Sequence, residues 1–467
     1  MSLSSTSLKI SAKEDLSFIY PFPALLLIIP FFLITVLCLL VGAAEILRSL
    51  FPILSLLIAL FLYFKYPTSY LGFVWWLWFL SPLVRRLIDF EVGWEDPNVV
   101  LLSPYLATLV TALDFIQYLP KITALGALPF LLSGVAVIYS LFVGLVTYPA
   151  DAVVVPLLGW ITPITFGFYL FINWQRYVEN CRAFQHTFLW GTLVMGGYGV
   201  WQFLTAPEWD RFWLTNSEAL AFGQPAPLEI RVWSTMHSPG PFSIVIMAGL
   251  LMLLANPKAA TLPATGLGYL AFLLSQVRAV WLGWIVGILT LITSLRPSFQ
   301  IRFVIMISVI ALLIVPLTNL DPYSEIITSR LESFYDLAGD DSFQDRAGGF
   351  GDLIGSAISQ ILGNGLGFVL QHRSLGANDS GIFTMLFTLG WFGTIFYLSG
   401  LALLVFKVFS KSSNHNDPLV NIFRSICLGT IVQFGLGPVM IGIYGVILWG
   451  FLGMTLAGQT YYKNIIR

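Results

Sequence analysis

The sequence predicts an all-α, polytopic membrane protein with about 12 to 14 transmembrane helices and a helical loop subdomain outside the bilayer. Of its 467 residues, 57% are hydrophobic and 10% are charged, whereas soluble domains carry roughly 25% charged residues. Apolar runs of membrane-spanning length recur along the whole chain, and the mean hydropathy is +0.84. Because no internal repeat or low-complexity linker interrupts them, we expect a single membrane domain over residues 1–467.

The individual spans follow from comparing each apolar run with the roughly 17 to 25 residues that a transmembrane helix needs. The first run has full span length and no small-residue cleavage site after it, so we interpret it as a retained helix. Residues 262–293 would form a single helix roughly 48 Å long, so two short spans hinged near Arg278 are expected instead. The predicted spans are 22–42, 50–64, 69–84, 99–117, 123–148, 152–173, 184–205, 241–255, 262–277, 279–295, 303–318, 379–406, 419–435 and 438–459.

The lysines predict the orientation of the chain. With the N-terminus inside, alternation through these spans puts every lysine on the cytoplasmic side, as the positive-inside rule requires. The sequence therefore predicts a multi-pass membrane protein with both termini cytoplasmic. Two long segments, 206–239 and 319–378, then become periplasmic loops, and the second is expected to contain short helices, including one over 350–362.

The charge balance and the rarer residue types exclude several functional classes. Lys plus Arg number 23 and Asp plus Glu number 24, so no basic field favours nucleic acid as a partner. The 3 cysteines lie in or beside apolar stretches without CxxC spacing, and the 4 histidines are scattered without paired-ligand spacing. We therefore expect neither a metal site nor a cofactor.

The cations expected on the periplasmic side are all arginines. A guanidinium is always charged and bonds two oxygens at once, which suits phosphate and pyrophosphate. These residues predict an anion site outside the membrane. They are Arg48, Arg85, Arg86, Arg211, Arg231, Arg278, Arg330, Arg346 and Arg373.

The alternative is that each arginine pairs with a nearby acid or extends to the lipid headgroups. Arg85 and Arg86 have Asp89 and Glu91 within reach along the chain; Arg330 has Glu332 and Arg346 has Asp345. Arg278 is the hardest to explain in this way, because a charge between two apolar runs is costly without a partner or a task.

Several motifs occur in a characteristic order between residues 231 and 393. Arg231 opens a segment ending in His-Ser-Pro-Gly-Pro-Phe-Ser243, and Arg278 lies in Ser275-Gln-Val-Arg-Ala-Val-Trp. Then come Ser329-Arg330, Asp345-Arg346, Gly363-Asn-Gly-Leu-Gly367 and a run from Asp379 to Gly393. In this order the chain resembles the bacterial O-antigen ligase and O-antigen polymerase superfamily; beyond this region it is similar only in hydropathy.

The resemblance implies a glycosyltransferase of the GT-C type that needs neither metal nor nucleotide sugar. Its donor would be an undecaprenyl-pyrophosphate-linked glycan on the periplasmic face, and its acceptor the hydroxyl of a growing glycan or a lipid. Membrane lipids and chain-length regulators or export proteins are the other implied partners. In the family, arginines matching Arg231 and Arg278 are associated with pyrophosphate and catalysis. We add Arg85, Arg86, Arg330, Arg346 and Arg373 as candidate pyrophosphate ligands.

One position departs from the ligase pattern. Family ligases carry a histidine where this chain has Asp379, ahead of the Gly390 to Gly393 end of the motif. The departure favours the polymerase branch, whose acceptor and base are less uniform.

A base is needed to take the proton of the acceptor hydroxyl. Asp379 is the first candidate and His372 the second; the alternatives are a helix N-cap for Asp379 and a solvated loop position for His372. His237, beside Pro239, is expected to shape the turn from loop to helix, and the 363–367 glycine run to form a flexible bend near the site.

Two other functional classes remain open. A transporter for an anion or small solute would also place cations in a helical bundle, although intramembrane charge is sparse here and no pair of discontinuous helices is evident. A non-catalytic envelope scaffold would explain the missing ligase histidine.

Overall fold

The computed structural model describes residues 21–217, 220–254, 261–294, 353–369, 380–410 and 417–465. In these residues the chain is a polytopic helical membrane protein, as predicted. Nine of the described helices are long and apolar enough to cross a membrane, and three shorter apolar helices accompany them. The described residues form no β-strand beyond an isolated bridge between Gly223 and Ile230.

The first half of the chain forms long helices joined by short turns. Their bounds are α2 Phe22–Leu40, α3 Ala44–Lys65, α4 Pro67–Val92, η1 Val99–Leu101, α5 Leu102–Leu109, α6 Ala112–Tyr118, η2 Leu119–Lys121, α7 Leu128–Thr147, α8 Ala150–Ile172, η3 Trp174–Arg176 and α9 Tyr177–Thr205. The span predicted over 99–117 is therefore a broken helix, because η1, α5, α6 and η2 share that stretch.

The second half is more interrupted. Its bounds are α10 Glu208–Asn216, η4 Leu220–Phe222, α11 Pro239–Leu253, α12 Leu262–Leu274, α13 Arg278–Ser294, α17 Gly381–Ser410, α18 Pro418–Ile431, η6 Val432–Gly435 and α19 Gly442–Ile465. The hinge predicted near Arg278 is confirmed, since α12 ends at Leu274 and α13 begins at Arg278. The predicted span 303–318 and most of the loop 319–378 lie outside the described residues.

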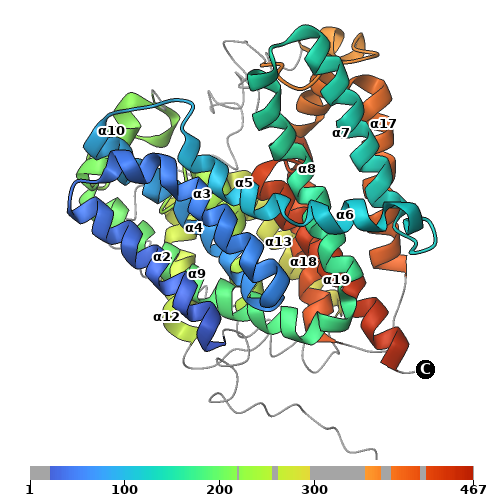
Figure 1. Ribbon diagram of the computed structural model, residues 1–467, viewed down its shortest axis with the longest axis horizontal. Coiled ribbons are helices and arrows are strands. Elements are labelled where there is room, and N and C mark those ends of the chain that lie inside the picture. Colours follow the sequence, from blue (N-terminus) through green and yellow to red (C-terminus); the bar gives the residue numbers. More distant parts are fainter. Residues whose placement is uncertain are drawn as a thin grey trace, which may run out of the picture.

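Figure 1 shows how these helices are arranged. Helices α2, α3, α4, α9 and α12 form one side of the bundle, and the pair α7 and α17 forms the other. Helices α8, α13, α18 and α19 lie between them. Helix α10 and the residues 353–369 lie at the same end of the bundle, which we call the α10 end; α2 begins and α19 ends at the opposite end.

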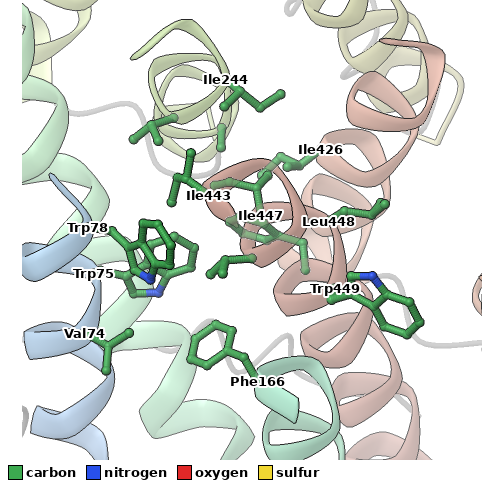
Figure 2. Close-up of a cluster of buried hydrophobic side chains, with 14 of the residues drawn as sticks. Val74, Trp75, Trp78, Phe166, Ile244, Ile426, Ile443, Ile447, Leu448 and Trp449 are labelled. Atoms are coloured by element: carbon green, nitrogen blue, oxygen red, sulfur yellow. The ribbon is translucent and has the colours of Figure 1, made fainter. Parts of the chain in front are cut away.

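Aromatic side chains and glycines bring the central helices together. In Figure 2, α4, α8, α11, α18 and α19 contribute side chains to one buried cluster around Trp75, Phe166 and Ile447. The ring of Trp75 lies 4.9 Å from that of Phe188. Gly167 of α8 and Gly453 of α19 leave no room for a Cβ between their backbones, the small-residue packing expected between membrane helices.

Two helices extend beyond their predicted spans because their charges find partners inside the protein. Helix α3 begins at Ala44 instead of residue 50, and α4 continues to Val92 instead of ending at residue 84. Arg48 of α3 and Asp89 of α4 form an ion pair of 3.0 Å within these extensions. A hydropathy scale treats each charged residue as unfavourable in a membrane span and takes no account of a partner on another helix, so it makes these predicted spans too short.

The short helices determine where the polar segments meet. Helices α11 and α12 have 15 and 13 residues and are therefore only about 20 Å long, less than the 30 Å of a bilayer core. They pack against each other and α11 also packs on α13, α18 and α19. The segment leading into α11 meets the end of α12, because the N–H of Val232 donates to the carbonyl of Leu274.

Candidate functional site

Of the nine candidate catalytic and pyrophosphate-binding residues, the structure describes four, all of them arginines. Arg85 and Arg86 lie in α4, Arg231 precedes α11, and Arg278 is the first residue of α13. The other candidates lie outside the described residues: Arg330, Arg346, His372, Arg373 and Asp379.

Arg231 and the α12–α13 hinge are brought together. The backbone N–H of Val232 donates to the carbonyl of Leu274 at 3.1 Å, which fixes this segment against the end of α12. The Arg231 guanidinium donates to the carbonyl of Gln276 at 3.1 Å and to that of Ala221 at 2.8 Å. Gln276 is two residues from Arg278, so the Arg231 side chain lies beside the hinge that leads into Arg278.

The hinge itself is held in a costly conformation. Gln276 has a φ of +55°, a region that side-chain-bearing residues rarely adopt. Ser275 anchors it to α11, since the hydroxyl of Ser243 donates to that of Ser275 at 2.8 Å. Half-buried Arg278 then opens α13, where the helix dipole adds to the attraction of its guanidinium for an anion.

Arg86 is fully buried and paired with an acid that the sequence did not single out. Its Nη1 lies 2.9 Å from Oδ1 of Asp210 in α10, and both side chains have 0% exposure. Asp210 Oδ2 also accepts from Tyr198 and from Gln202, each at 2.9 Å. Burial raises the pKa of the Asp210 carboxyl, and the positive charge of Arg86 opposes that rise.

The same guanidinium supports the backbone of the 231–238 segment. Arg86 donates to the carbonyl of Ser234, a residue with a φ of +51°. Gln202 completes the support, because its Oε1 accepts from the backbone N–H of Trp233 at 3.1 Å and of Ser234 at 2.8 Å. In this conformation Arg86 is out of reach of a dissolved ligand and acts on the shape of the segment beside it.

Arg85 belongs to a polar network at the α10 end. Its Nε donates to Asp89 at 3.1 Å and its Nη2 donates to the carbonyl of Glu95 at 2.8 Å. Arg48 and Asn98 also donate to Asp89, at 3.0 and 2.8 Å. The pairing of Arg85 with Asp89 that the sequence left open is therefore confirmed, whereas Arg86 pairs with Asp210 in place of Asp89 or Glu91.

His237 differs from its neighbours in the same segment. Val232, Trp233, Ser234, Thr235 and Met236 are all buried, whereas His237 is exposed. Surrounding protein, together with the charges of Arg85 and Arg86, lowers the pKa of His237 to about 4. The imidazole is therefore accessible and neutral at pH 7.

The glycine run at 363–367 forms a bend held by backbone contacts. The N–H groups of Asn364 and Gly365 donate to the carbonyls of Phe387 and Thr388 at 2.7 and 3.0 Å. A Cβ on Gly365 would overlap the backbone of Gly144 in α7, so these residues are closely packed rather than loosely arranged. The predicted bend thus joins α7 to α17 beside Gly390, where α17 is kinked.

Within the part of the chain that the structure describes, no group of three or more His, Cys, Asp or Glu side chains could hold a metal ion. The described polar groups at the α10 end include arginines, the carboxylates of Asp89 and Asp210 that pair with them, and one accessible imidazole.

Comparison with protein-family models finds no match, and comparison with curated proteins finds none either. The resemblance to O-antigen ligases and polymerases therefore rests on the sequence motifs alone.

Sequence reasoning missed the residues that support the site. Asp210 lies in the polar loop segment Glu208-Trp-Asp-Arg211, where nothing in the pattern distinguishes a buried acid from an exposed one. Gln202 lies near the end of an apolar helix and carries no motif. The sequence did draw attention to His237, which lies between Arg231 and Pro239. Whether its ring is exposed, however, depends on how the neighbouring residues fold.

Proposed function

We propose that this protein transfers or polymerises glycan from an undecaprenyl-pyrophosphate-linked oligosaccharide to an acceptor hydroxyl at the periplasmic face of a bacterial inner membrane. The observation that carries the proposal is the convergence of Arg231 with the N-terminus of α13, which begins at Arg278. The α10 end is the periplasmic end in this proposal, and both chain termini are cytoplasmic.

The chemistry accounts for the arginines. Breaking the bond between the sugar and pyrophosphate leaves concentrated negative charge on the leaving group. Guanidinium and N–H groups already aimed at that position stabilise the transition state more than the ground state. Arg278 and Arg231 take this role, and Arg330, Arg346 and Arg373 are further candidate ligands.

The partners follow from the reaction. They are the lipid-linked donor, an acceptor glycan or lipid, the surrounding membrane lipids, and chain-length regulators or export proteins that would act on the product. Asp379 in the place of the ligase histidine favours polymerase activity, with Asp379 and His372 as candidate bases.

The deciding experiment incubates purified protein in detergent or nanodiscs with undecaprenyl-pyrophosphate oligosaccharide and follows product length. We expect longer lipid-linked glycan from the wild type. Arg278→Lys should lose transfer by about 10²-fold or more, because an ammonium cannot reproduce the planar two-oxygen contact of a guanidinium.

Arg176→Ala is the matched control, since Arg176 is an exposed arginine in η3, next to the start of α9. It should retain transfer. Absence of transfer by the wild type, combined with uptake of an anion or small solute into proteoliposomes, would reject the proposal and support a transporter.

A further inference from the structure

In the turn before α11, hydrogen bonds with α4 and α9 hold residues 233–235, whereas the ring of His237 makes none with these helices. The backbone of Trp233 and Ser234 is held by Gln202 of α9, and the carbonyl of Ser234 is held by Arg86 of α4. The hydroxyl of Thr235 donates to the carbonyl of Phe79, also in α4. The buried Met236 comes next, and after it the exposed His237, whose ring makes no hydrogen bond with any other described residue.

The cost of this turn indicates a purpose beyond packing. Ser234 keeps a left-handed backbone conformation, which is unfavourable for a residue with a side chain and persists only where surrounding contacts impose it. The imposed turn buries five consecutive residues and leaves the imidazole after them accessible. A turn needed only to start α11 would not require the histidine to remain accessible, since Pro239 already suits the first helical position.

The charges around His237 match an anionic substrate. The charged groups that act on the ring are Arg85 and Arg86, both from α4. Among the described residues no carboxylate acts on it. The ring is neutral at pH 7, and an anion bound next to the ring itself would make it more basic.

We propose that His237 accepts the proton of the acceptor hydroxyl during glycan transfer. This inference rests on the proposed function and assigns its base. The acceptor oxygen forms a bond to the anomeric carbon while the bond from that carbon to the pyrophosphate oxygen breaks. That electron pair leaves on the lipid pyrophosphate, and the acceptor proton passes to the unprotonated ring nitrogen, from which it is released to water.

The assignment couples proton transfer to donor binding. Without the pyrophosphate, desolvation by the surrounding protein, and after it the charges of Arg85 and Arg86, keep the imidazole a weak base. With it, the ring gains basicity at the moment when an acceptor hydroxyl has a glycosyl donor to attack. Asp379 and His372 then serve in other roles, such as capping α17 or contacting the acceptor.

The test compares His237→Gln and His237→Asn with wild type in the transfer assay, over a range of pH. Both variants keep a polar side chain but cannot take a proton at neutral pH. We expect kcat to fall 10²- to 10⁴-fold while KM for the lipid donor stays within about threefold. The acid limb of the wild-type pH–rate profile should be absent from both variants.

Ser238→Ala is the matched control, because the Ser238 side chain makes no capping hydrogen bond to α11. It should retain wild-type turnover. Thermal unfolding of each variant in the same detergent reports whether the fold is kept, and two substitutions at position 237 guard against one that fails to fold.

The outcomes separate this inference from the proposed function. If wild type transfers glycan and the His237 variants do so within threefold, the assignment is wrong and the proposed function stands. A rise in KM with unchanged kcat would also reject it, since it indicates binding alone. If wild type transfers nothing, the proposed function fails and the assignment fails with it.

Discussion

At the scale of single residues, the described arginines differ in what their guanidinium groups contact. Arg86 is enclosed with Asp210, and Arg85 belongs to the network around Asp89. Arg231 bonds backbone carbonyls of the hinge, and Arg278 begins a helix. The residue type alone predicted one shared role, whereas the contacts divide the arginines into those that shape the site and those that can meet a ligand.

The buried pair yields a prediction about stability. Asp210→Asn removes the charge that balances Arg86 and should lower the free energy of unfolding by about 3 to 5 kcal/mol, because an uncompensated buried charge remains. Thermal or denaturant unfolding of purified protein in detergent measures this loss.

Glu208→Gln provides the control, since Glu208 is an exposed acid on the same helix. It should change stability by less than about 0.5 kcal/mol. Equal stability of the two variants would show that the Arg86–Asp210 pair does not hold α10 on the bundle.

At the scale of elements, close backbone contact between helices places the short segments. Gly283 of α13 and Gly429 of α18 approach as closely as Gly167 of α8 and Gly453 of α19. These contacts hold α13, and with it Arg278, against the centre of the bundle. In a membrane such packing takes the place of the hydrophobic effect, which does not separate one apolar surface from another.

Glycine substitution tests this packing. In Gly453→Ala the added Cβ would overlap the backbone of Gly167, so we expect destabilisation of about 1 to 3 kcal/mol. The measurement is the unfolding midpoint of the purified variant compared with wild type.

Gly266→Ala, in α12, has open space around its added Cβ. Alanine there should leave stability unchanged or raise it by up to about 1 kcal/mol, because it favours the helix. If both alanine variants unfold alike, the α8–α19 contact is not as tight as the structure shows.

At the scale of the whole molecule, the α10 end gathers the site. Helix α10 and residues 353–369 lie there, while α2 begins and α19 ends at the opposite end (Figure 1). Arg86, which pairs with Asp210 of α10, also holds the 231–238 segment through the carbonyl of Ser234. This arrangement makes the proposed orientation testable without any assay of activity.

Thiol labelling tests the orientation in right-side-out membrane vesicles. In a chain whose Cys38, Cys181 and Cys427 are replaced by serine, an added Asn216→Cys in α10 should react with a membrane-impermeant reagent. Gln175→Cys, exposed in η3 at the opposite end, should react only after the vesicles are opened. The reverse pattern would place the α10 end in the cytoplasm and remove the basis for periplasmic transfer.

The sequence by itself determined the all-helical membrane fold, the position of most spans and the break before Arg278. These follow from the length of apolar runs and from the cost of burying charge, which are local properties. The same reasoning selected Arg231 and Arg278, which the structure brings to one hinge.

Only the tertiary structure decided the partners and the exposure of individual side chains. Asp210 can be buried because it pairs with Arg86, which lies 124 positions earlier in the chain. His237 is accessible because α4 and α9 hold the residues before it. Burial and pairing depend on contacts between residues far apart in sequence, and hydropathy and spacing carry no information about such contacts.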